Sequence, residues 1–173
     1  MISTATVSPS TATGTVTFKD GSKTLGTASI SGGSASLIES NLTVGAHSIT
    51  AVYSGDTNDA GSVSNTVSQT VSKANTTISL ASSLNPAKSK NTVTFTVNVA
   101  AAVPGAGNPT GTITFKDTTT NKTLGTGVVN SSGQATCSTS SLSVTTHSIV
   151  AVYGGDTNFN GSTSNTMSQV ITK

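Results

Sequence analysis

Two nearly identical stretches carry the residues of this sequence whose side chains could do chemistry. HSITAVYSGDTN begins at His47 and HSIVAVYGGDTN begins at His147, so a His, a Tyr and an Asp recur together. A His titrates near neutral pH and binds metals. Neither His has a second His, a Cys or an acid at ligand spacing in the sequence. We therefore expect a structural role, in which one ring nitrogen bonds to the backbone a few residues upstream.

The turn GDTNFNG at the end of the second stretch resembles the front half of a calcium-binding loop. Asp156, Asn158 and Asn160 place oxygen ligands at alternate positions. Such a loop requires a bidentate Glu at its twelfth position, and that position is Met167. In the first copy Ala60 replaces the third oxygen ligand. Any metal site at these residues is expected to be weak, and capping of the turn by the Asp and Asn side chains is the favoured interpretation.

No other group of residues indicates catalysis. Cys137 is the single cysteine, so no disulfide can form within the chain, and it aligns with Leu37 of the first copy as a small core residue. A Ser nucleophile requires a placed base and an orienting acid. The chain has only six carboxylates, mostly in expected turns. We expect no catalytic residue, no cofactor and no enzymatic activity.

Composition excludes further classes of function. Charged residues make up 8% of the chain, and the positive charges are scattered lysines, which argues against a nucleic-acid partner. Aromatic residues make up 3% and Trp is absent, which argues against a sugar or drug-like ligand. No apolar run approaches the ~20 residues of a membrane span, so membrane insertion is not expected. The abundance of Ser, Thr, Asn and Gly suits an extracellular or cell-surface protein.

The repeat extends well beyond the two opening stretches. GTVTFKD at Gly14 recurs as GTITFKD at Gly111, and GSVSNTVSQTV at Gly61 recurs as GSTSNTMSQVI at Gly161. The spacing grows where DGSK becomes DTTTNK and where SISGG becomes VVNSSG, and such insertions are typical of turns. A period near 100 residues is the usual size of an independent domain.

Alternation with a period of two residues predicts β-strands throughout. Val93, Phe95, Val97 and Val99 share one face of a strand, and residues 62–72 form another alternating run with Val, Asn and Gln on one face. The Asp-Gly pair in the first copy is a strong hairpin signal. About seven short strands per repeat indicate an immunoglobulin-like β-sandwich.

The motifs TGTITFKD, TLGTASI, LTVGAHSITAVYSGDTN and SVSNTVSQTV, taken in order, resemble the bacterial Ig-like repeat family found in tandem in large surface and secreted proteins. The resemblance covers nearly the whole chain. It implies an all-β fold of two tandem immunoglobulin-like sandwiches. It also implies stalk or adhesin modules outside the cell, with no catalytic residues to transfer.

The two expected domains are not equivalent. Domain 1 is expected at residues 1–73 and domain 2 at residues 74–173. Domain 2 contains every expected strand. Domain 1 has no counterpart of residues 74–95, so we expect it to lack its N-terminal strand. An unpaired edge of this kind can recruit a strand from another chain.

Three functions follow from these expectations. The first is a non-catalytic structural spacer or stalk of a bacterial surface or secreted protein, with neighbouring Ig-like repeats as its partners. The second is an adhesin that binds through variable loops such as AAAVPGAGNP. The third is a self-assembling filament whose protomers donate strands to domain 1. The opening residues, MISTATVSPS, lack the pattern of a secretory signal, so a fragment or a mature form is expected.

Overall fold

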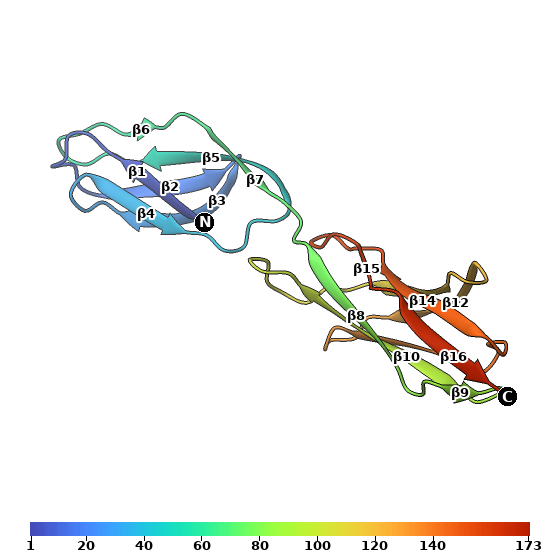
Figure 1. The fold of residues 1–173 in the computed structure, drawn as a ribbon. Coiled ribbons are helices and arrows are strands. Elements are labelled where there is room, and N and C mark those ends of the chain that lie inside the picture. Colours follow the sequence, from blue (N-terminus) through green and yellow to red (C-terminus); the bar gives the residue numbers. More distant parts are fainter. The chain divides into compact units, whose positions relative to one another are not determined.

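The computed structural model describes all residues 1–173, and every regular element in it is a β-strand (Figure 1). The chain divides into two compact parts, which we call unit 1 (Met1–Ser72) and unit 2 (Lys73–Lys173). Both are built only from sheets, so the expected all-β fold class is confirmed. No helix that is long and apolar enough to cross a membrane is present.

Unit 2 contains two sheets whose strands are mostly antiparallel. Its strands are β8 (Thr76–Ser82), β9 (Ala87–Lys88), β10 (Val93–Ala101), β11 (Thr112–Asp117), β12 (Lys122–Val128), β13 (Gln134–Thr139), β14 (Thr146–Tyr153), β15 (Ser162–Thr163) and β16 (Met167–Thr172). One sheet has the order β13-β10-β8. The other has the order β12-β11-β14-β16-β9, with β15 attached to β14. The β9–β16 pair is parallel.

The core of unit 2 lies between these two sheets. Val93, Phe95, Val97 and Val99 of β10 are all buried, as the period of two predicts, and the residues between them are more exposed. They pack in one cluster with the inward residues of β11, β14 and β16. The hydrophobic effect therefore holds the two sheets face to face.

Unit 1 repeats this plan with fewer strands. Its strands are β1 (Ile2–Thr6), β2 (Thr15–Asp20), β3 (Lys23–Ser29), β4 (Ser34–Ile38), β5 (Gly45–Tyr53), β6 (Ser62–Val63) and β7 (Val67–Val71). One sheet consists of β1 and β4 alone, and the other has the order β3-β2-β5-β6, with β7 paired to β5. No strand of unit 1 corresponds to β8 or β9.

The hairpins that differ in length between the copies confirm where the insertions fall. β2 and β3 are joined by a two-residue turn, since Asp20 pairs with Lys23, and Gly21 has a positive φ of 54°. This is the hairpin predicted from the Asp-Gly pair. In unit 2 the corresponding pair is Asp117 with Lys122, and the two extra residues lie in the turn between them.

The pairing of β1 identifies its equivalent in unit 2 and corrects one expectation. Val7 donates its backbone N–H to the Gly33 carbonyl at 2.8 Å, and Val99 donates to the Gly133 carbonyl at 2.8 Å. β1 is therefore the counterpart of β10. Because the pairing with β4 continues to Ile2, and Met1 still bonds to Glu39, unit 1 has no counterpart of residues 74–92, rather than of 74–95 as the sequence suggested.

A second correction concerns residues 62–72, which the alternation predicted as one strand. The structure divides them into β6 and β7, with Ser64–Thr66 between them. The Ser64 hydroxyl accepts from the Ala51 N–H at 2.9 Å and donates to the Asn65 carbonyl at 2.7 Å. A side chain thus takes the place of a backbone partner and interrupts the ladder. The same break separates β15 from β16, where Ser164 has the same bonds.

Candidate functional site

A His–Asp pair lies at one end of each sandwich. In unit 1 the Nδ1 atom of His47 is 2.7 Å from Oδ2 of Asp20. The Nε2 atom of His47 is 2.9 Å from the carbonyl oxygen of Thr43, four residues upstream. The expected bond to the upstream backbone is confirmed, whereas the carboxylate partner was not expected from the sequence.

Unit 2 contains the same pair at greater depth. His147 Nδ1 lies 2.8 Å from Asp117 Oδ2, and its Nε2 lies 3.0 Å from the Ser143 carbonyl. Both side chains of the pair are only 1% exposed, compared with 9% for His47 and 23% for Asp20. A polar pair at this depth requires complete hydrogen bonding to be tolerated.

The hairpin that follows each Asp adapts to complete the pair. In unit 1 the Ser48 N–H donates directly to Asp20 Oδ1 at 3.0 Å. In unit 2 the equivalent N–H belongs to Ser148. It donates to the hydroxyl of Thr119, in the longer turn, at 2.8 Å. Asp117 in turn accepts from the Thr119 N–H and from a neighbouring threonine hydroxyl of the same turn. The longer turn therefore replaces the direct bond between the carboxylate and the Ser N–H by two threonine hydroxyl bonds and one backbone N–H bond.

The electrostatics of the unit 1 pair favour a charged imidazole. Each ring nitrogen of His47 faces an oxygen acceptor, so the doubly protonated ring donates to both. The hydrogen bond to Asp20 raises the pKa of His47, with a further contribution from the Thr43 carbonyl. The hydrogen bonds from His47 and from the Ser48 N–H lower the pKa of Asp20. In unit 2, burial acts to raise the pKa of Asp117, but bonds from Thr120 and His147 outweigh it and the pKa is lowered.

Ser143, His147 and Asp117 superficially resemble a nucleophile, a base and an acid. The Ser143 hydroxyl lies 3.4 Å from His147 Nε2, but the Ser143 carbonyl lies closer, at 3.0 Å. The nitrogen that would have to accept the hydroxyl proton therefore faces a carbonyl acceptor, to which it donates. Thr43 stands at the equivalent position in unit 1. The geometry favours a clamp that ties the hairpin to the loop before β14.

The turn residues considered as calcium ligands serve other contacts. Asp156 Oδ2 accepts from the N–H and the hydroxyl of Thr110, at 2.8 and 2.7 Å. Its Oδ1 accepts from the N–H groups of Asn158 and Phe159, at 2.8 and 2.9 Å. Burial acts to raise the pKa of Asp156, but these four bonds outweigh it and hold the pKa well below its usual value. Asp156 caps the turn, as the favoured interpretation predicted.

Asn158 and Asn160 hold the chain where it enters unit 2. The Ala74 N–H donates to the Asn158 carbonyl at 2.9 Å, and the Asn160 N–H donates to the Ala74 carbonyl at 2.8 Å. The Asn160 side-chain amide also donates to Asn75 Oδ1 at 2.9 Å. No three His, Cys, Asp or Glu side chains gather anywhere in the chain. This anchoring of the entry segment was not predicted, because the sequence does not show that residue 74 meets residue 158.

Cys137 is partly buried and packs against the core of unit 2. Its Sγ lies 2.7 Å from the point where a Cβ on Gly125 would stand, and the Leu37 side chain lies over Gly26 in the same way. Burial raises the pKa of the Cys137 thiol, which disfavours the reactive thiolate. Its position is that expected of a core residue.

Two facing sheets, an order of strands shared by both units and the same clamp at the start of β5 and β14 define an immunoglobulin-like β-sandwich protein. The family model for the bacterial Ig-like domain (group 3) matches residues 2–72 and 80–172. The chain therefore belongs to this family, as the resemblance of its motifs indicated. No curated protein sequence matches the chain significantly.

Solved structures of low sequence identity were also found. The fibronectin(III)-like modules of Clostridium thermocellum CbhA share 15% identity with this chain, over 99% of it and 84% of their own length, with a TM-score of 0.41. The BSP domain structure of a biofilm associated protein shares 19% identity, over 99% of this chain and 27% of its own, with a TM-score of 0.34.

The Asp117→Ala substitution tests the clamp in unit 2. Removing the carboxylate leaves the buried His147 ring and the turn donors without their acceptor, so we expect unit 2 to lose about 3 kcal/mol of stability. Urea unfolding followed by NMR signals assigned to each unit measures this. Asp20→Ala is the matched variant, and a smaller loss is expected because Asp20 is more exposed. Equal losses in the two units would contradict the argument from burial.

The unit 1 pair predicts a specific dependence of stability on pH. Because the pKa of His47 is raised in the folded state, its stabilisation is complete below the unfolded value of about 6.5 and is lost as pH rises through the folded pKa. Because the pKa of Asp20 is lowered, its contribution is present above about 3.8 and is lost as pH falls through the folded pKa. Unit 1 is therefore expected to lose stability as pH rises above about 6.5 and through the folded pKa of His47.

The His47→Gln variant isolates this effect, since other groups also titrate in that range. The free energy of unfolding of unit 1 is measured for both proteins across the pH series. The difference between them is expected to shrink as pH rises. A difference that stays constant with pH would show that protonation of His47 does not stabilise unit 1.

Proposed function

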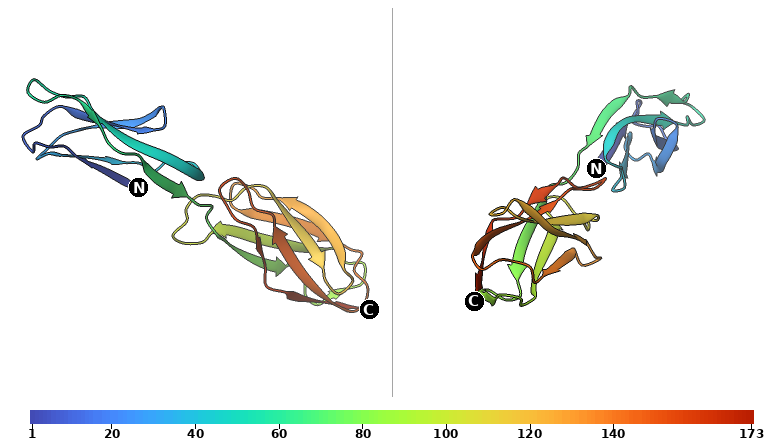
Figure 2. Two further views of the ribbon diagram at one scale, coloured as in Figure 1. Left: turned by 90° about the horizontal axis from the view of Figure 1, so that it is seen from above. Right: turned by 90° about the vertical axis from the view of Figure 1, so that its right-hand side faces the viewer.

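We propose that the chain is a non-catalytic structural spacer of a bacterial cell-surface or secreted protein, in which each Ig-like unit transmits tension between its neighbours. The observation that carries the proposal is the position of the chain ends in unit 2. The chain enters at one end of this sandwich and leaves at the other (Figures 1 and 2). A module with its two ends apart can be linked in series.

The entry is fixed by the turn that Asp156 caps. Ala74 bridges to the backbone on both sides of Phe159, and the Thr76 hydroxyl donates to the Asn160 carbonyl at 3.0 Å. Phe159 itself is buried in the core of unit 2. The entering chain is therefore tied to the body of the sandwich before β8 begins.

The exit is fixed at the opposite end by β16. This strand runs antiparallel to β14, and the Ile171 N–H donates to the Thr145 carbonyl at 2.9 Å, near the start of β14. β9 pairs with the last residues of β16 in parallel. When the two ends are pulled apart, the bonds of β8 and β16 to their neighbours lie across the direction of pull and share the load.

The family and the composition support the location and the passive role. Bacterial Ig-like domains supply the bacterial context, and a surface with few charges and many hydroxyl groups suits the outside of a cell. The His–Asp pairs and the capped turns are used to join strands in both units. These features support a load-bearing module and no catalytic role.

Substitution of Asn85 tests whether the bonds to β16 resist the pulling force. Its side chain joins the segment after β8 to β16, because its amide donates to the Ser168 carbonyl at 2.6 Å and its oxygen accepts from the Val170 N–H at 2.9 Å. We expect Asn85→Ala to lower the force at which unit 2 unfolds when the chain is pulled from its two ends. Single-molecule force spectroscopy measures this force.

Asn130→Ala is the matched control for this experiment. Asn130 is also exposed and also makes two side-chain bonds, to the N–H groups of Ser132 and Gln134, but these lie within one turn. Each substitution is expected to cost about 1–2 kcal/mol at equilibrium. If both variants unfold at the same reduced force, or if the native units unfold without measurable resistance, the spacer proposal is wrong.

A further inference from the structure

An asparagine followed by a glycine lies where the chain enters unit 2. Asn160 and Gly161 connect the turn capped by Asp156 to β15, and both residues are exposed to solvent. No other asparagine in the chain is followed by glycine. Asparagine is one of the chemically labile residues of proteins. Its side-chain amide can be attacked by the backbone nitrogen of the next residue, and glycine hinders this attack least because it has no Cβ.

The fold requires a glycine at position 161. A Cβ on Gly161 would stand 2.7 Å from the carbonyl oxygen of Tyr153, so β14 passes too close for a side chain. Gly61 of unit 1 meets a similar constraint, since its Cβ would stand 3.0 Å from the Tyr53 carbonyl oxygen. The glycine is therefore a consequence of close backbone packing and is present in both units.

The asparagine at position 160 is present for a different reason. Its N–H donates to the Ala74 carbonyl at 2.8 Å, and its carbonyl accepts from the Thr76 hydroxyl at 3.0 Å. Its side-chain amide donates to Asn75 Oδ1 at 2.9 Å. Unit 1 has Ala60 at the equivalent position. The labile pair therefore arises only in unit 2, where an anchoring asparagine precedes the required glycine.

The attacking nitrogen and the amide that it would attack are both accessible. The Gly161 N–H donates to no protein acceptor, so hydroxide can remove its proton without breaking a hydrogen bond of the fold. The Asn160 side-chain amide is held by one bond from its nitrogen, which leaves the Cγ atom free. The pair lies between the Ala74–Phe159 bridge and β15. The backbone between the two residues is therefore not fixed by a strand ladder.

We propose that Asn160 is a site of spontaneous deamidation, and that the reaction weakens the attachment of the entering chain to unit 2. The Gly161 nitrogen loses its proton and forms a bond to Asn160 Cγ. The bond from Cγ to Nδ2 breaks, and the amide nitrogen takes up a proton and leaves as ammonia. Water then opens the succinimide ring at one of its two carbonyl carbons, which gives aspartate or isoaspartate. The reaction consumes one water molecule and needs no other co-reactant.

Each product removes contacts that hold the entering chain. In the aspartate product a carboxylate replaces the amide that donated to Asn75 Oδ1, so that bond is lost. In the isoaspartate product the main chain runs through Cβ and Cγ and becomes longer by one carbon. The carbonyl that accepted from the Thr76 hydroxyl then belongs to a carboxylate outside the main chain. The bonds to Ala74 and Thr76 no longer match the spacing of the entering backbone.

This inference goes beyond the spacer proposal, because the reaction requires no load and no neighbouring module. It makes the anchoring of the entering chain depend on the age of the protein. The entry is tight in newly made protein and loosens as Asn160 is converted. Unit 1 has no equivalent reaction, because Ala60 has no side-chain amide.

The test incubates the purified full chain at physiological temperature, in buffers of neutral and of mildly alkaline pH. Peptide mapping by mass spectrometry measures conversion at every asparagine and distinguishes isoaspartate from aspartate. We expect Asn160 to be converted first, and faster at the higher pH, because loss of the Gly161 proton starts the reaction. If Asn160 stays unmodified in the folded chain while it is converted in urea, the fold protects the pair and the proposal is wrong.

Hydrogen exchange of the aged chain tests the structural consequence. The Ala74 N–H donates to the Asn158 carbonyl at 2.9 Å and reports whether the entering chain is attached. We expect this amide to exchange roughly tenfold faster in the converted protein, as for the loss of about one hydrogen bond. The amides of β5 in unit 1 are expected to keep their rates. Conversion of Asn160 without a change at Ala74 would overturn the proposal.

The Asn160→Gln variant is the matched control. Its side chain keeps an amide, but the extra methylene makes ring closure with the Gly161 nitrogen much slower. We expect the aged variant to keep the Ala74 exchange rate of the freshly prepared variant. Equal acceleration at Ala74 in the aged variant and the aged native chain would show that a different change loosens the entry, and would contradict the proposal.

Discussion

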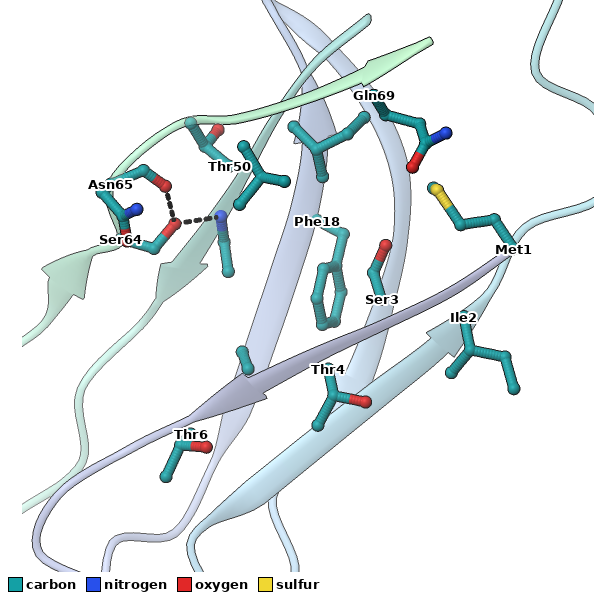
Figure 3. Close-up of a pocket in the computed structure, with 14 residues that line it drawn as sticks. Met1, Ile2, Ser3, Thr4, Thr6, Phe18, Thr50, Ser64, Asn65 and Gln69 are labelled. Carbon is teal, nitrogen blue, oxygen red and sulfur yellow. Dashed lines mark hydrogen bonds between the residues drawn. The ribbon is translucent and has the colours of Figure 1, made fainter. Parts of the chain in front are cut away.

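The packing of unit 2 depends on the segment that covers the inner face of its last strand, β16. β8 pairs with β10 on one sheet and presents Ile78 and Leu80 to the core, while the following segment is fastened to β16 through Gln169 and Asn85. With this segment in place the two sheets enclose a continuous apolar core. In unit 1, where no strand takes this place, Gln69 is partly exposed and Val67 is 56% exposed. A groove lined by residues of β1, β5 and β7, and by Phe18, lies beside them (Figure 3).

In unit 2 the repeated twelve-residue stretch, residues 147–158, makes contacts at both ends of the sandwich. In unit 2 its strand, β14, begins beside the His147–Asp117 pair, which holds the hairpin between β11 and β12. The same stretch runs on to the turn capped by Asp156, which holds the entering chain at Ala74. β14 and the turn that follows it therefore contain the contacts that hold both ends of the sandwich. This explains, in physical terms, why a His and an Asp recur together without forming a catalytic or metal site.

Local patterns in the sequence predicted those features of the fold that depend on residues close together in the chain. The two-residue hairpin after Asp20 and the buried face of β10 followed from turn residues and alternation. The His–Asp pairs were missed because each carboxylate lies about 30 positions upstream. The sequence does contain a signal for these pairs, because an Asp follows the same TFK motif in both repeats. The break at Ser64 was missed because alternation does not show when a hydroxyl replaces a backbone partner.

Native-state hydrogen exchange of the chain alone tests most directly whether the cover that β8 and β9 provide distinguishes unit 2 from unit 1. It compares the amides of β1 and β7 with those of their counterparts, β10 and β16. The account predicts that β1 and β7 exchange much faster, because their edge and inner face are open while β8 and β9 protect the equivalent strands. Equal protection of the two pairs of strands would contradict it, since the groove in unit 1 would then be closed in solution.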